Sequence, residues 1–173
     1  MSAASVFVAE RGDPDSFVRE VLGSALGCEP AELRFGRTER GKPFLEHPAG
    51  GPRFSVSHSG GLVAVAVAAG REVGVDVQET RPVTRLMEIA ERHFTPDESA
   101  ALRGAGGDER LALFHRLWVR KEAYLKATGE GLAGSLASFD ALALSLPPGW
   151  ELEDLELPAG YAGAVAVCPL SHS

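Results

Sequence analysis

The chain has 173 residues, of which 45 % are hydrophobic and 24 % charged, and these proportions indicate a folded globular protein. Its formal net charge of −7 disfavours general nucleic-acid binding, which needs a strongly basic surface. The longest apolar run, Leu62 to Ala69, is too short to cross a membrane, and the N-terminus lacks the pattern of a signal peptide. Cys28 and Cys168 have neither zinc-site nor disulfide-framework spacing. We therefore expect a cytoplasmic protein that binds neither membranes nor nucleic acid.

The first third of the chain predicts one helix followed by extended segments. Asp13 and Pro14 provide an N-cap and a first-turn proline, and Gly27 ends the helix. Two extended stretches follow, "ELRFGRTERGKPFLE" and "RFSVSHSGGLVAVAVAAGREVGVDVQ". The second contains two β-rich runs joined by a turn at Gly70 and Arg71.

The remainder predicts helices and then strands. Helices are expected at about 82–93, 95–103 and 108–128. The second of them begins with Thr95-Pro96-Asp97-Glu98, which is a capping box with proline at the first helical position. Strands are then expected in "FDALALSL", "WELEDLEL" and "YAGAVAVCPL".

This order predicts an α+β fold with two similar α/β halves, each a helix packed on a small, mostly antiparallel sheet. The segments "LVAVAVAAG" and "YAGAVAVCP" close a similar order of elements, which favours a pseudo-two-fold repeat although identity between the halves is low. We expect the N-terminal half to comprise residues 1–79 and the C-terminal half residues 80–173. A fused pair of this kind is expected to be a monomer.

The glycines at 129, 131 and 134 match a dinucleotide-binding pattern, but their context does not. That motif must follow a strand and open a helix, because the phosphate binds at the helix N-terminus. Here Gly129 follows a predicted helix, where a glycine C-cap is expected.

The long helix carries an unusual row of charges beside its core-facing side. At 100° per residue the core stripe contains Leu111, Phe114, Trp118 and Leu125. A second row, consisting of His115, Glu122 and Lys126, lies beside this stripe, and Arg116 and Arg120 point away. Taken alone, Glu122 and Lys126 are better explained as a surface pair at i, i+4, because charges on helices usually form solvated faces.

Asp76 strengthens a functional interpretation of that row. In "VGVDVQ" the valines occupy one strand face, and Gly74, Asp76 and Gln78 the other. Aspartate is depleted in strands, although a charge on an edge strand can also serve to discourage aggregation. If Asp76 faces Glu122, the two carboxylates could share Mg²⁺, which prefers oxygen ligands.

Two turns carry further candidates. "SVSHSGG" gathers Ser57, His58 and two glycines, but neighbouring Ser and His side chains on a strand point to opposite faces, which excludes a serine–histidine hydrolase. Phosphate contact is a more natural role, with ordinary turn formation as the alternative. Lys42 and Pro43, in Gly-Lys-Pro, form either a plain turn or a rigid turn that directs a lysine at a phosphate.

In this order the motifs resemble the phosphopantetheinyl transferase superfamily, in its longer, pseudo-dimeric surfactin type. The shared segments are Gly-Lys-Pro at 41–43, "FSVSHSG", "VGVDVQ", "WVRKEAYLKATGEGL" and, before the long helix, "HFTPDESAAL". The resemblance is close over about residues 30–140.

The resemblance implies an enzyme that transfers 4′-phosphopantetheine from coenzyme A to a serine of a carrier protein and releases adenosine 3′,5′-bisphosphate. It implies Mg²⁺, or alternatively Mn²⁺, on Asp76 and Glu122, with Glu122 also as the base for the carrier serine. Lys126 would stabilise the charge that develops on the phosphate. Anchors for coenzyme A would be Lys42, Pro43, Ser57, His58, Lys121 and Lys126.

The sequence departs from the family pattern at two places. Many members carry a second acid where this chain has Gln78, so we expect two carboxylates plus water on the metal, with Gln78 as a ligand through water. The chain is also expected to lack most of the family's N-terminal strand and basic segment. Arg37, Arg40 or Arg53 would then replace contacts to the nucleotide.

The partner implied by the resemblance is an acidic acyl or peptidyl carrier protein. Because the chain is itself acidic, docking requires a local basic surface, for which Arg81, Arg85 and Arg92 are candidates. The alternative function is a coenzyme A-binding module that regulates or scaffolds a carrier pathway without turnover.

Overall fold

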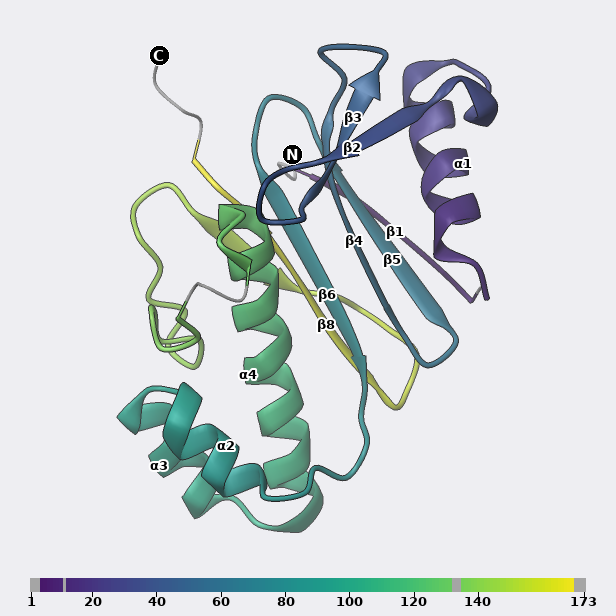
Figure 1. The fold of residues 1–173 in the computed structure, drawn as a ribbon. Coiled ribbons are helices and arrows are strands. Elements are labelled where there is room, and N and C mark those ends of the chain that lie inside the picture. The colour runs from purple at the N-terminus through teal and green to yellow at the C-terminus, as the bar shows by residue number, and fades with distance from the viewer. Residues whose placement is uncertain (1–3, 11, 132–134, 170–173) are drawn as a thin grey trace.

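The computed structural model describes residues 4–10, 12–131 and 135–169. Its elements in chain order are β1 (Ser5–Glu10), α1 (Pro14–Leu26), a 3₁₀ turn η1 (Pro30–Glu32), β2 (Arg34–Arg37), β3 (Pro43–His47), β4 (Arg53–Ser59), β5 (Leu62–Ala68), β6 (Val73–Glu79), α2 (Leu86–His93), α3 (Pro96–Gly104), α4 (Gly107–Thr128), β7 (Glu151–Asp154) and β8 (Tyr161–Val167). Figure 1 shows α4 lying across one sheet, with α2 and α3 at one end of it.

The helix ends follow the predicted caps. The Asp13 side chain accepts hydrogen bonds from the first turn of α1, and Gly27 closes that helix in the left-handed region. Thr95 and Glu98 form the predicted capping box of α3. Gly129 ends α4 with φ 73°, which confirms the C-cap interpretation. The third glycine of that pattern, Gly134, lies outside the described residues.

The N-terminal half is a helix on an antiparallel sheet. Its strand order is β1-β5-β4, and β2 and β3 form a separate hairpin. The apolar face of α1 packs on β4 and β5 through a cluster that includes Phe17, Leu22, Phe54 and Val63. The structure has an N-terminal strand that the sequence did not predict, since β1 pairs with β5 over its whole length.

The C-terminal half repeats this plan. Its strands have the antiparallel order β6-β8-β7, and α4 covers one face of the sheet (Figure 1). The core beneath α4 includes Leu117, Val119, Ala123 and Ala166. The predicted α+β fold, with a helix on a small antiparallel sheet in each half, is confirmed. Because β6 pairs with β8, the strand that carries Asp76 belongs to the second sheet.

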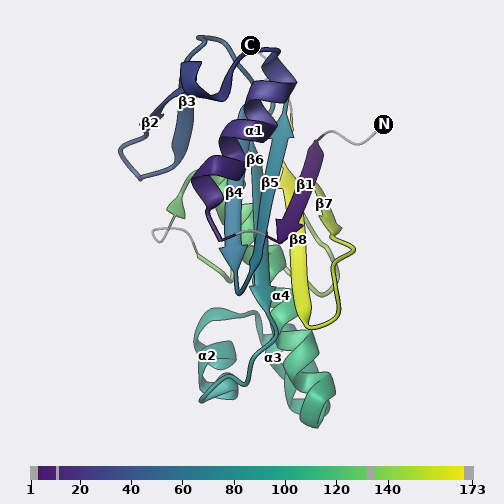
Figure 2. The ribbon, with the colours of Figure 1, turned by 90° about the vertical axis from the view of Figure 1, so that its right-hand side faces the viewer.

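Serine side chains join the two halves. The hydroxyl oxygens of Ser55, Ser57 and Ser59 on β4 accept hydrogen bonds from main-chain N–H groups of β6, at 3.1, 3.1 and 2.9 Å. The donors belong to Val75, Val77 and Glu79. Figure 2 shows β4 beside β6 along this line. Side-chain acceptors thus take the place of a main-chain ladder between the sheets, because buried N–H groups need partners. We call this line the serine seam.

Two local predictions are wrong. "FDALALSL" alternates like a strand, but residues 141–144 form a turn. The Asp140 carboxylate accepts hydrogen bonds from the N–H groups of Leu142 and Ala143, which favours the turn over a strand. The expected helix over 82–93 begins only at Leu86.

The orientation of one arginine also differs. Arg120 was expected to point away from the core with Arg116, and Arg116 is indeed exposed. Arg120 is buried and makes a bidentate ion pair with Asp154 of β7, with both N–O distances at 2.7 Å. Periodicity missed this because the chain after α4 returns over the helix and buries a second side of it.

Candidate active site

Gly74 allows α4 to lie directly on β6. The valines of β6 face one core cluster, whereas the opposite strand face meets α4, as the alternation predicted. A Cβ atom at Gly74 would lie 2.0 Å from the Ala123 carbonyl oxygen and 2.5 Å from the Ala127 nitrogen. Only glycine fits this approach, which brings the last turns of α4 close to Asp76.

Asp76 and Lys126 form an ion pair at the place where strand and helix meet. The Lys126 Nζ atom lies 2.9 Å from Asp76 Oδ1 and donates a second hydrogen bond to the Val75 carbonyl oxygen at 3.1 Å. Asp76 is only 3 % exposed, whereas the Lys126 side chain is 32 % exposed. The Ser57 hydroxyl donates to the same carboxylate oxygen at 3.0 Å, and Gln78 Nε2 donates to the other at 3.2 Å. The strand aspartate is therefore fixed from three sides.

Glu122 lies one helical turn before Lys126 and is half-buried. Burial raises the pKa of its carboxyl group, the nearby Asp76 carboxylate raises it further, and Lys126 opposes the rise. The two acids are therefore near enough to repel each other, while their joint hold on a metal stays a prediction.

These side chains fit a hard cation. The carboxylates of Asp76 and Glu122 and the amide oxygen of Gln78 offer the oxygen ligands that Mg²⁺ prefers, and a cation there would relieve the repulsion between the two acids. Within the described parts of the chain, no group of three or more His, Cys, Asp or Glu side chains is placed to hold a metal. The set therefore contains two carboxylates, and water would have to complete the coordination.

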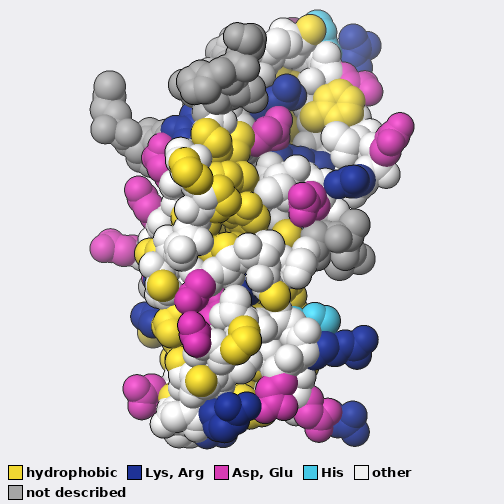
Figure 3. Space-filling model, turned by 90° about the vertical axis from the view of Figure 1, so that its left-hand side faces the viewer, with side chains coloured by type: hydrophobic (Ala, Val, Ile, Leu, Met, Phe, Trp, Pro, Cys, Tyr) yellow, Lys and Arg dark blue, Asp and Glu magenta, His cyan; other side chains and the backbone are white. Residues whose placement is uncertain are grey.

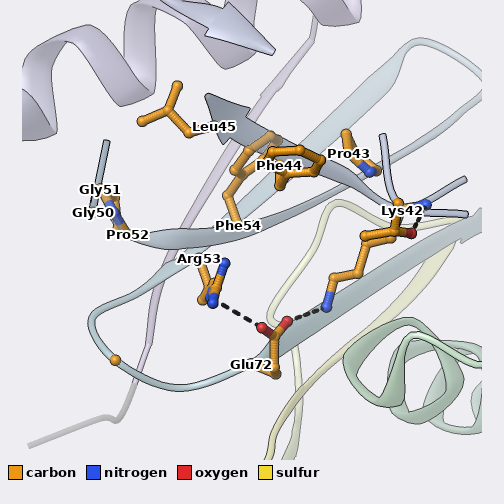
Figure 4. Close-up of a pocket in the computed structure, with 12 residues that line it drawn as sticks. Lys42, Pro43, Phe44, Leu45, Gly50, Gly51, Pro52, Arg53, Phe54 and Glu72 are labelled. Atoms are coloured by element: carbon orange, nitrogen blue, oxygen red, sulfur yellow. Dashed lines mark hydrogen bonds and ion pairs between the residues drawn. The ribbon is translucent and has the colours of Figure 1, made fainter. Parts of the chain in front are cut away.

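Lys42 lines a cavity of about 570 Å³ beside the hairpin of β2 and β3. Its Nζ atom lies 2.5 Å from Glu72 Oε2, and the other oxygen of Glu72 lies 3.0 Å from Arg53 Nε (Figure 4). Pro43 lines the same cavity. Lys42 also donates to the Ala127 carbonyl oxygen at 3.4 Å, which links this cavity to the end of α4.

Adjoining hollows connect Lys42 to Glu122. A smaller cavity of about 220 Å³ is lined by both Lys42 and Lys126. Next to it lies a hollow of about 570 Å³ lined by Arg92, Trp118, Glu122 and Lys126. The first two hollows share Lys42 and the last two share Lys126, so the three adjoin one another, and Glu122 lines the third.

Two predicted anchors, His58 and Lys121, lie elsewhere, and Ser57 contacts Asp76 instead of lining a cavity. Ser57 is buried in the serine seam and contacts Asp76 rather than an open cavity. His58 is exposed on the opposite face of β4, in a hollow shared with Glu10 and Pro14. Lys121 is fully buried on another side of α4 and forms an ion pair with Glu98. The structure thus brings together Asp76, Gln78, Glu122, Lys126, Lys42 and Pro43, but not His58 or Lys121.

Sequence reasoning missed the serine seam and the role of Glu72. The period-two serines in "SVSHS" were a usable signal for the seam, since alternate side chains share one strand face. Glu72 carries no comparable signal, because its two partners are 30 and 19 positions away.

Comparison with known proteins identifies relatives. Residues 72–156 match the 4′-phosphopantetheinyl transferase superfamily. The 4′-phosphopantetheinyl transferase HetI of Nostoc sp. is 37 % identical over 93 % of this chain and 70 % of its own length. A 4′-phosphopantetheinyl transferase of Bacillus subtilis is 34 % identical, over 79 % of this chain and 62 % of its own length. The transferase Sfp of Bacillus subtilis strain 168 is 30 % identical over 87 % of this chain and 70 % of its own length.

These matches include both strand β6 and helix α4, which carry the acids and Lys126. The chain belongs to the 4′-phosphopantetheinyl transferase superfamily, a family of enzymes, and resembles its surfactin type.

Proposed function

We propose that the protein transfers 4′-phosphopantetheine from coenzyme A to a serine of an acidic carrier protein, with Mg²⁺, and releases adenosine 3′,5′-bisphosphate. The observation that carries this proposal is the buried Asp76, held by Lys126 and Ser57 beside the half-buried Glu122. Lys126 lines two adjoining hollows and Glu122 lines one of them, and the relatives named above are transferases of this kind.

In the proposed reaction the serine oxygen forms a bond to the phosphorus of the pantetheine phosphate, and the pyrophosphate P–O bond breaks. Such phosphoryl transfers depend mainly on positioning and on neutralising charge. When bound, Mg²⁺ would neutralise pyrophosphate oxygens, and Asp76 and Glu122 would hold it, with Gln78 acting through water.

Glu122 is the proposed acceptor of the serine proton, directly or through water. Its carboxyl group lines the hollow of Arg92 and Trp118, where a serine hydroxyl can approach it. Lys126 is bound by Asp76 and the Val75 carbonyl oxygen and has an open side toward two hollows, so its ammonium group can face the charge on the leaving phosphate.

The nucleotide end of coenzyme A is assigned to the cavity of Lys42 and Pro43. Lys42 and Arg53 supply two cations there. The adjoining hollow is lined by both Lys42 and Lys126, so one extended ligand can contact both lysines. Glu72 already neutralises part of that charge, so binding a phosphate requires that its ion pairs rearrange.

For the carrier, Arg92 is the favoured docking residue, because it lines the hollow of Glu122. Arg81 and Arg85 form ion pairs with Glu79 and Glu88. Figure 3 shows one face of the molecule. At its α2–α3 end, positive and negative side chains are interspersed and do not form one continuous basic patch. No helix in the described chain is both long and apolar enough to span a membrane.

The test is the intact mass of a panel of apo carrier proteins after incubation with the protein, coenzyme A and Mg²⁺. We expect a gain of one phosphopantetheine that Glu122→Gln abolishes. Glu109→Gln, an exposed acid in the first turn of α4, is the matched control and should leave the gain intact. Coenzyme A binding without any carrier modification would instead support a module that binds coenzyme A without turnover.

A further inference from the structure

Lys121 is the neighbour of Glu122 in sequence but lies in a sealed environment. Lys121 and Glu98 are both 0 % exposed, and Lys121 Nζ lies 2.9 Å from Glu98 Oε1. The same ammonium group donates to the carbonyl oxygens of Leu136 at 2.6 Å and Phe139 at 2.8 Å. The rings of Phe94 and Phe139 lie 5.5 and 5.0 Å from it and keep water away.

Glu98 extends this network to two more backbone positions. Its Oε2 atom accepts a hydrogen bond from the Thr95 N–H at 2.8 Å, and Oε1 accepts one from the Ala141 N–H at 2.6 Å. The pair thus ties the start of α3, the middle of α4 and the segment 136–141 together. Every polar atom of both side chains that needs a partner in this dry site has one.

The tied segment also forms part of the hollow beside Glu122. Ser135, Leu136 and Ala137 line that hollow together with Glu122 and Arg92. The carbonyl group that Lys121 holds most closely is therefore that of a wall residue, Leu136. We call Ser135, Leu136 and Ala137 the acceptor wall.

Stability alone does not explain this arrangement. Burying two charges requires removal of their water, and apolar side chains of similar volume are often as stable or more stable at such places. A lysine here does what an apolar residue cannot, because it fixes two carbonyl groups of an irregular segment in defined positions.

We propose that the Lys121–Glu98 pair positions the acceptor wall and thereby sets the affinity of the Glu122 hollow for the serine-bearing segment of the carrier protein. The proposal rests on the proposed function and assigns Lys121 a positioning role rather than contact with coenzyme A. The nucleotide cavity of Lys42 shares no lining residue with the acceptor wall, so we expect the contacts of the nucleotide end of coenzyme A to be kept.

The test compares the wild type with a double variant, Lys121→Met with Glu98→Gln, which removes both charges and avoids leaving one of them buried alone. We expect the KM for carrier protein to rise about tenfold, while the KM for coenzyme A and the kcat at saturation change less than about threefold. Hydrogen exchange at the Ala141 amide should become faster, since its acceptor is weakened.

The matched control is Arg71→Met with Glu151→Gln. Arg71 likewise contacts one carboxylate and two carbonyl oxygens, those of Cys168 and Gly149, but does not line the Glu122 hollow. It should leave both KM values unchanged. If the first double variant does not fold, Leu136→Ala shortens the acceptor wall with the pair intact and should give the same separation of the two KM values.

Unchanged exchange at Ala141, or KM values for carrier and coenzyme A that rise together, would overturn the positioning role. A merely structural role would lower the active fraction and leave both KM values as they are. Absence of transfer by the wild type would contradict the proposed function, whereas the exchange measurement tests the fixing of the segment without any turnover.

Discussion

Helix α4 carries two lysines, Lys121 and Lys126, each paired with an acid from another element, and the two pairs differ in their exposure to water. Lys121 and Glu98 are sealed from water and also hold backbone groups. Lys126 is one-third exposed, pairs with Asp76 and borders two hollows. The spacing in "KEAYLK" does not distinguish them; the elements that cover each side of the helix do.

The difference in exposure indicates a structural role for Lys121 and a chemical role for Lys126 on the same helix. A charge that is fully enclosed and fully partnered cannot meet a ligand, and its effect must pass through what it holds. A charge with an open side can exchange partners when a phosphate arrives. Glu122, between the two lysines, belongs to the open group because it lines the same hollow as Lys126.

The largest predicted effect is on stability at the sealed pair. Lys121→Met alone leaves Glu98 buried without its cation and should lower the free energy of unfolding by about 3–5 kcal/mol. Lys126→Met should lower it by only about 1–2 kcal/mol, because the exposed side of Lys126 lets water screen this pair. Urea denaturation of both variants measures this comparison, and equal losses would contradict it.

The next effect concerns the contact of α4 with β6. Gly74→Ala places a methyl group against the Ala123 carbonyl and should destabilise the protein by about 1–3 kcal/mol. It should also weaken the Asp76–Lys126 pair by moving the helix outward. Gly61→Ala is the control, since nothing lies within 4 Å of a Cβ there and thermal unfolding should be unchanged. An unaffected melting temperature in Gly74→Ala would show that the helix approach is not tight.

Ser57→Ala tests the serine seam beside the Lys126–Asp76 pair. It removes the acceptor of the Val77 N–H and a donor to Asp76, and should lower the free energy of unfolding by about 1–2 kcal/mol. Ser59→Ala, at the less buried end of the seam, should cost about half as much. A larger loss for Ser59→Ala than for Ser57→Ala in chemical denaturation would argue against this ranking.

The smallest effect is the pH dependence that Glu122 confers on stability without metal. Because its folded pKa is raised, the folded state binds the proton more tightly than the unfolded state. Its contribution is therefore fully present below the unfolded pKa and is lost as pH rises through the folded pKa. In the presence of a metal chelator, the melting temperature of Glu122→Gln should be slightly higher than that of the wild type at pH 7. At pH 4 the two melting temperatures should be the same. A Gln variant less stable at pH 7 would reverse the sign.

The sequence predicted the helices and their caps from local signals, and the family from motifs with fixed spacing. Alternation along β6 placed Gly74, Asp76 and Gln78 on one face, and α4 does lie there. The metal, coenzyme A and carrier assignments remain proposals.

What the sequence did not predict depends on distant chain segments. The environments of Lys121 and Arg120 are determined by residues 135–154, which return over α4 and bury sides that periodicity marks as solvated. The turn at 141–144 reflects hydrogen bonds of Asp140 that outweigh a strand-like alternation. β1 was missed because a short, half-exposed edge strand carries a weak pattern.

We propose that Glu122 and Lys126, with Asp76, perform the transfer. The single-turnover rate of carrier modification, followed by intact mass, tests this most directly. Wild type and folded Lys126→Met would be compared at saturating coenzyme A, carrier and Mg²⁺. We expect a rate about 10²–10³-fold lower for Lys126→Met, because the charge on the leaving phosphate loses its neutralising group. A rate within about threefold of the wild type would contradict it.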